Sequence, residues 1–183
     1  MKRLLALFLC FAALAATAQE RAIRASVVVP APLDEVWAAW TTTEGVKSFF
    51  APGAKVEARV DGPFEVYFNP YAAPGLKGAE GMRFLAIQEK KMITFTWNAP
   101  PSMPEARKQR TYVTVRFHPK GNGTTEVTLY HGGWGDGGDW DRAFAYFEKA
   151  WTAVLTALEA RFAKGPVDWT DMLKRMRPPG SAK

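Results

Sequence analysis

A single apolar stripe between residues 140 and 162 constrains the fold more than any other feature of the chain. Large apolar residues recur there at intervals of three and four, the spacing of one face of an α-helix. They are Trp140, Phe144, Phe147, Trp151, Leu155, Leu158 and Phe162. Aspartates at the start of the stripe can cap a helix, and Gly165-Pro166 would end it. The pattern predicts one amphipathic helix of about six or seven turns.

The chain before this helix reads as a series of short strands. The first, residues 21–29, stops at Pro30, and apolar residues at helical spacing then predict two short helices before Pro52. Six further strand-like segments follow: Lys55–Val60, Phe64–Phe68, Met82–Gln88, Met92–Trp97, Thr111–His118 and Thr125–His131. Turn residues between closely spaced strands favour antiparallel pairing. The predicted class is α+β, with a curved antiparallel sheet of about six to seven strands around the long C-terminal helix.

The N-terminal segment has the layout of a secretory signal peptide. Lys2 and Arg3 precede an unbroken apolar run over residues 4–16, and an Ala-Thr-Ala cleavage sequence ends at Ala18. The run is too short for a permanent transmembrane anchor, although an uncleaved anchor stays open as the alternative. We therefore expect residues 1–18 to be removed, leaving an exported protein, periplasmic or secreted, with no stable membrane anchor.

Composition excludes several classes of function. Cys10, the single cysteine, would leave with the signal peptide, which excludes thiol catalysis and zinc–thiolate sites. The formal charge of +6 includes Lys2 and Arg3, and the other bases form no long run, so no nucleic-acid partner is expected. Two histidines without a nearby carboxylate pair predict neither a metal nor another cofactor.

Several segments resemble a known superfamily. The run Val27–Pro32 followed by Trp37 is similar to the opening signature of START-like (SRPBCC) proteins. Within that superfamily, Thr94–Trp97, Thr125–Leu129 and His131–Trp134 resemble the branch of activator of Hsp90 ATPase homologues. The resemblance covers residues 21–165 and implies a helix-grip fold enclosing an apolar pocket. Residues 166–183 would form a tail, either one short helix or a loose end.

Strand alternation indicates which side chains face this pocket. Val127, Leu129 and His131 share one face of the last strand, and aromatic residues share the corresponding face of its neighbours. The predicted ligand-binding set is His131, Trp97, Phe95, Phe64, Phe68, Phe117, Trp134, Phe147 and Trp151. His131 has two interpretations: a polar anchor at the pocket mouth, or a structural histidine tied to the backbone or to the helix start. His118 is expected to be exposed.

Three functions follow as hypotheses. The leading one is a binding protein for a small hydrophobic or aromatic ligand. The second is an acid–base enzyme acting on a cyclic or polyketide-like substrate through His131 with Tyr67 or Arg83; no set of partners completes a mechanism, so no catalytic residue is assigned. The third is a module that binds a protein partner through residues 98–109 and the tail around Trp169.

Overall fold

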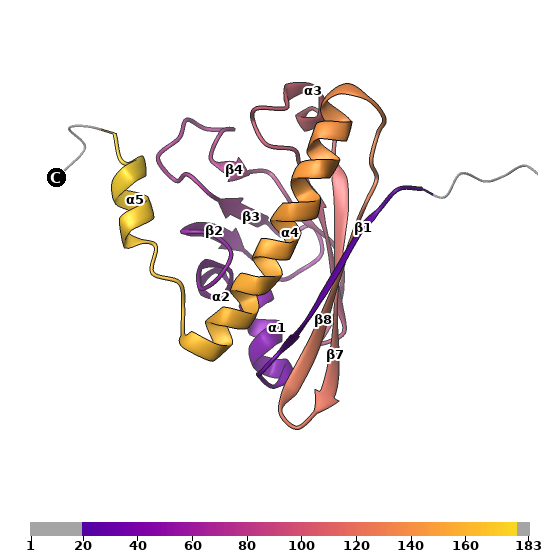
Figure 1. Ribbon diagram of the computed structural model, residues 1–183, viewed down its shortest axis with the longest axis vertical. Coiled ribbons are helices and arrows are strands. Elements are labelled where there is room, and N and C mark those ends of the chain that lie inside the picture. Colours follow the sequence, from indigo (N-terminus) through magenta and orange to yellow (C-terminus); the bar gives the residue numbers. More distant parts are fainter. Residues whose placement is uncertain (1–19, 179–183) are drawn as a thin grey trace, which may run out of the picture.

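The computed structural model describes residues 20–178, so the predicted signal peptide lies outside the described residues. The elements are, in order, β1 (Ile23–Val29), α1 (Leu33–Thr41), α2 (Thr43–Lys47), β2 (Gly53–Val56), β3 (Phe64–Tyr67), β4 (Gly78–Ala79), β5 (Phe84–Gln88), β6 (Met92–Trp97), α3 (Pro104–Arg107), β7 (Thr111–Gly121), β8 (Thr124–Gly132), α4 (Gly138–Lys164) and α5 (Thr170–Met176). Figure 1 shows α4 crossing one face of the large sheet, with α1 and α2 near one end of that helix. The α+β class is confirmed.

The large sheet has five antiparallel strands in the order β1-β8-β7-β6-β5. β8 lies between β1 and β7, and its register pairs His131 with Ile23 on one side and Val113 on the other. The face of β8 that carries Val127, Leu129 and His131 is buried, as strand alternation predicted. His118 is exposed, also as predicted.

The expected single sheet is in fact two. β2, β3 and β4 form a separate three-stranded sheet, and β2 ends at Val56 instead of continuing to residue 60. The chain turns at Asp61, which has the left-handed φ of 60°. Pro63, next to β3, makes an isolated bridge to Arg83, formed by hydrogen bonds from the N–H of Phe64 to Met82 and from the N–H of Phe84 to Gly62. The two sheets therefore meet without forming one continuous ladder.

The long helix α4 spans 27 residues and buries the predicted stripe, with Phe147, Trp151, Leu155 and Leu158 in the core. Its start differs from the expectation of a carboxylate cap. Gly137 occupies the capping position, and no side chain caps the helix. Asp139 instead accepts a hydrogen bond of 2.9 Å from the backbone N–H of Glu105, in the first turn of α3. The aspartate thus joins α4 to α3.

The segment after Gly165 forms a short helix, α5, and does not stay loose. The indole N–H of Trp169 donates to the carbonyl oxygen of Lys47 at 2.7 Å, and the N–H of Val167 donates to the carbonyl oxygen of Ser48 at 2.9 Å. The last residues reach the β3–β4 connection, where Arg177 lies over the ring of Tyr71. We call residues 166–177 the C-terminal strap. Within residues 20–178, no helix is both long and apolar enough to cross a membrane.

Candidate functional site

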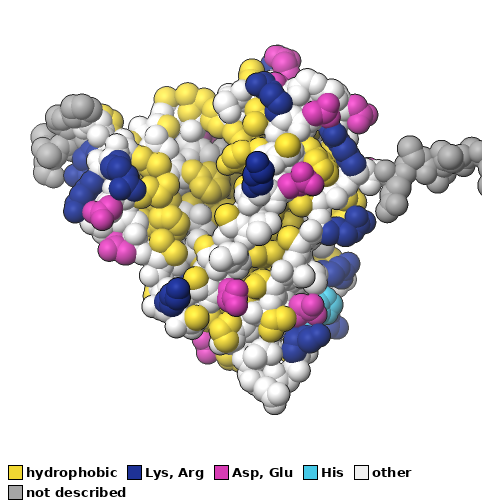
Figure 2. Space-filling model, in the orientation of Figure 1, with side chains coloured by type: hydrophobic (Ala, Val, Ile, Leu, Met, Phe, Trp, Pro, Cys, Tyr) yellow, Lys and Arg dark blue, Asp and Glu magenta, His cyan; other side chains and the backbone are white. Residues whose placement is uncertain are grey.

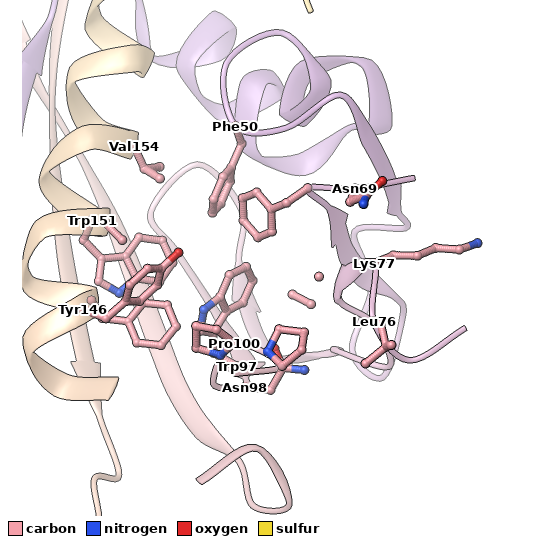
Figure 3. Close-up of a pocket in the computed structure, with 16 residues that line it drawn as sticks. Phe50, Asn69, Leu76, Lys77, Trp97, Asn98, Pro100, Tyr146, Trp151 and Val154 are labelled. Carbon is pink, nitrogen blue, oxygen red and sulfur yellow. The ribbon is translucent and has the colours of Figure 1, made fainter. Parts of the chain in front are cut away.

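An apolar cavity of about 230 Å³ lies between α4 and two irregular segments opposite it. One wall is α4, with Tyr146, Phe147, Ala150, Trp151 and Val154. The opposite walls are the β3–β4 connection and the segment that follows β6, with Phe50 between them (Figure 3). In the space-filling view, hydrophobic side chains gather in the hollow beside α4 (Figure 2).

Aromatic rings hold the cavity walls in place by packing on one another. Phe50 and Trp97 are stacked, with ring centroids 5.8 Å apart. The ring centroid of Trp151 lies 5.8 Å from that of Phe50, in an edge-on arrangement, and 5.4 Å from that of Trp97, in a tilted one. Phe68 packs edge-on against Phe50 at 5.9 Å. Because each ring is supported by at least one other ring, the walls have little freedom to collapse into the cavity.

The structure places the predicted ligand-binding residues in two groups. Trp97, Phe68, Phe147 and Trp151 line the cavity. The others lie outside its lining: Phe64, Phe95, Phe117, Trp134 and His131. Phe64 and Phe95 are fully buried and stacked at 4.0 Å, Phe117 packs on Trp37, and Trp134 packs on His131. Strand alternation predicted a continuous pocket over this face of the sheet. Part of that space is filled by the aromatic rings of the face itself.

His131 sits beneath the cavity wall, with both ring nitrogens hydrogen-bonded. Its Nδ1 accepts from the indole N–H of Trp151 at 2.8 Å. An indole only donates, so the imidazole proton is assigned to Nε2, which donates to the hydroxyl of Thr111 at 2.7 Å. That hydroxyl lies 3.3 Å from the carbonyl oxygen of Trp97, to which it donates. The chain of bonds connects the two tryptophans of the cavity wall.

The environment keeps His131 neutral. The side chain is fully buried, and burial lowers its pKa to about 3, because a charged imidazolium would lose its hydration. Of the two interpretations of this residue, the hydrogen bonds support the structural one. They fix the positions of Trp97 and Trp151 without presenting a free nitrogen to the cavity.

The groups proposed for acid–base chemistry do not assemble around His131. The hydroxyl of Tyr67 donates to Glu65, which together with burial raises the pKa of the phenol. Arg83 is exposed and donates to the carbonyl oxygen of Asp61 at 2.6 Å. The described chain also holds no cluster of three or more His, Cys, Asp or Glu residues suited to a metal ion.

Arg107 joins the two irregular walls. Its guanidinium donates to the carbonyl oxygen of Ala99 in the segment after β6. It also donates to the carbonyl oxygens of Gly75 at 2.6 Å, in the β3–β4 connection, and of Gly78 at 2.8 Å, the first residue of β4. Burial lowers the pKa of this arginine. One side chain thus sets the spacing between two segments that have no regular structure of their own.

The predicted set contained four of the sixteen residues of the lining and missed twelve, among them Phe50, Tyr146 and Asn98. Phe50 follows α2, and strand alternation says nothing about a residue in a turn. Tyr146 precedes Phe147 on α4, so helical spacing placed it at the edge of the apolar stripe. Asn98 comes directly after β6, where a polar residue reads as the start of a loop.

A curved antiparallel sheet packed around a long C-terminal helix, with an apolar cavity beside that helix, defines a helix-grip domain. The sequence model of one family, described as activator of Hsp90 ATPase homolog 1-like protein, matches residues 30–163. The chain belongs to this family. No functionally curated protein matches the sequence.

Solved structures with the same fold include protein MLL2253 from Mesorhizobium loti, which is 19% identical with a TM-score of 0.64, over 80% of this chain and 100% of its own. The Aha1 dimer from Colwellia psychrerythraea is 17% identical with a TM-score of 0.60, over 79% of this chain and 98% of its own. DynU16, from the dynemicin biosynthetic locus, is 20% identical with a TM-score of 0.59, over 79% of this chain and 48% of its own.

Proposed function

We propose that this protein binds a small hydrophobic or aromatic molecule in the cavity beside α4. The observation that carries the proposal is an apolar space of about 230 Å³ whose aromatic walls are braced from outside by other rings and by His131. A concave apolar space of this size, lined by aromatic rings and a few polar groups, is typical of a small-molecule site. The similar fold of DynU16, a protein in the dynemicin biosynthetic locus, agrees with this proposal.

Filling the cavity tests the proposal. Ala150 lines it on α4, and Ala163 is exposed on the last turn of the same helix. Ala150→Trp places an indole in the space that the ligand would occupy, whereas Ala163→Trp adds the same side chain outside it. We expect native mass spectrometry of the wild-type protein, purified from its own host, to show a retained small molecule. Ala163→Trp should retain the same molecule and Ala150→Trp should lose it.

Titration with 1-tetralone, a bicyclic aromatic ketone, gives a second measurement. Calorimetry should show binding to the wild type and to Ala163→Trp, and at least about tenfold weaker binding to Ala150→Trp, which is a loss of about 1.4 kcal/mol. A folded Ala150→Trp variant, verified by circular dichroism, that binds as tightly as the wild type would show that the ligand does not occupy this cavity.

We also propose that the protein acts outside the cytoplasm, on the basis of residues 1–18 alone. When the full chain is expressed in a bacterial host, the periplasmic or secreted fraction should contain a protein whose intact mass begins at Gln19. Finding only the full-length chain in the cytosol or membrane fraction would contradict export. That result would leave the binding proposal unchanged.

A further inference from the structure

Asn98 differs from the other polar residues that are buried in the described chain. Five polar residues are buried in the described chain: Thr41, Asn98, Thr111, Thr125 and His131. The side chains of the other four have hydrogen-bond partners. Asn98 is 6% exposed, and its amide makes no hydrogen bond with any residue in 20–178. It is also the member of this group that lines the cavity.

The amide of Asn98 is accessible from the cavity. The side-chain atoms that are fully buried and unpaired in residues 20–178 are Nε of Arg21 and Nε1 of Trp40, and neither polar atom of the Asn98 amide is among them. The amide of asparagine offers both an N–H donor and a carbonyl acceptor. Figure 3 shows Asn98 beside Trp97 and Pro100, on the wall formed by the segment after β6. The indole N–H of Trp97 likewise donates to no residue in the described part of the chain, so this wall offers a ligand two adjacent polar groups.

The rest of the lining restricts the charge of the ligand. Lys77 is the single charged residue among the residues that line the cavity. Figure 3 shows its side chain extending away from the space between Phe50 and Trp151. No carboxylate or guanidinium lines the cavity to pair with an ionised ligand. An ion buried among these rings would lose its hydration without compensation, so the walls favour a neutral molecule.

The volume and the rings restrict its size and shape. A cavity of about 150 Å³ lined by apolar side chains holds benzene. The present cavity, at about 230 Å³, has room for a second fused ring. The rings of Phe50, Trp97 and Trp151 provide flat surfaces against which such a molecule can stack.

Building on the proposed function, we infer that the ligand is a neutral bicyclic aromatic molecule with one carbonyl or hydroxyl group, and that the amide of Asn98 is its hydrogen-bond partner. The aromatic walls supply most of the binding free energy, and Asn98 selects the oxygen-bearing compound over the hydrocarbon of the same shape.

A matched pair of probes tests this inference. 1-Tetralone and tetralin differ only in the ketone oxygen. Calorimetry on the wild type should show roughly tenfold tighter binding of 1-tetralone, from one buried hydrogen bond. In Asn98→Leu this preference should disappear, while tetralin still binds. Gln109→Leu is the control, because Gln109 is exposed and lies outside the cavity lining.

A second measurement does not depend on a variant that folds. In nitrogen-15 NMR spectra of the wild type, the side-chain amide signal of Asn98 should shift on addition of 1-tetralone and stay close to its free position with tetralin. Equal binding of both probes to the wild type, or the same preference in Asn98→Leu, would overturn the inference and leave the proposed function standing. Binding of neither probe, together with no retained molecule in native mass spectrometry, would overturn both.

Discussion

At the residue scale, His131 couples the stability of the fold to pH. Its folded pKa is about 3, whereas an unfolded histidine titrates near 6.5. Below about pH 6.5, His131 binds a proton in the unfolded chain but stays neutral in the folded chain, so acid favours unfolding. The stabilisation is complete above pH 6.5 and is lost as the pH falls toward 3. The slope approaches about 1.4 kcal/mol per pH unit over most of this range.

Urea unfolding at pH 7.5 and pH 5.0 measures this effect. We expect the free energy of unfolding of the wild type to drop by about 2 kcal/mol between these two values from His131 alone. His131→Gln should be less stable at pH 7.5 and should lose most of this pH dependence. His118→Gln is the matched control, because His118 is exposed on β7. An unchanged pH dependence in His131→Gln would show that another group is responsible.

His131 also shows which features of the site could be predicted from the sequence and which could not. Alternation along β8 correctly predicted that the His131 side chain faces the core. The hydrogen-bond partners of His131 could not be predicted from the sequence. They depend on the rotation of α4 against the sheet, which brings Trp151 opposite Nδ1. That rotation is fixed by packing of many side chains together and has no signature at any single position.

At the element scale, the regular parts of the fold were predictable and the cavity walls were not. The period of α4 and the paired faces of β6, β7 and β8 were predictable because a buried face repeats every 3.6 or every two residues. The break between the two sheets lies next to Asp61, a residue with positive φ, where only the isolated bridge between Pro63 and Arg83 joins them. Residues 61–63 read in the sequence as a turn between two strands, but a turn signal does not show whether those strands belong to one sheet or to two.

The cavity depends on segments without any period. Its two irregular walls are held by Arg107, a residue that reads in the sequence as part of a solvated basic cluster. Its hydrogen bonds go to backbone carbonyls, so no opposite charge in the sequence signals them. Similarly, Asp139 reads as a cap for its own helix but joins α4 to α3.

At the scale of the whole molecule, the C-terminal strap ties the end of α4 to the far side of the cavity. It begins directly after Gly165 and passes α2, where Trp169 and Val167 donate to backbone carbonyls. It then reaches Tyr71, whose hydroxyl accepts from Arg177 at 3.3 Å. Tyr71 belongs to the β3–β4 connection, which also provides Leu76 and Lys77 to the cavity lining. Figure 1 shows the chain turning back after α4 to place α5 near these strands.

This arrangement predicts that the strap restrains the cavity wall more than it stabilises the core. No residue of α5 is buried, so removing its contacts exposes little apolar surface. Trp169→Phe removes the hydrogen bond to Lys47 and keeps an aromatic ring; the expected loss in unfolding free energy is about 1 kcal/mol. Hydrogen exchange should become faster for amides of residues 69–77, while exchange in β7 and β8 stays unchanged.

Lys174→Ala is the control for this experiment, because Lys174 is exposed and its one ion pair, with Asp171, lies within α5. The variant should exchange like the wild type throughout the chain. If Trp169→Phe leaves exchange at residues 69–77 unchanged, the strap does not restrain the β3–β4 connection, which then owes its position to other contacts, such as those of Arg107 and Glu80. If exchange rises there, residues far apart in sequence share control of the same wall, and access to the cavity depends on the C-terminal end of the molecule.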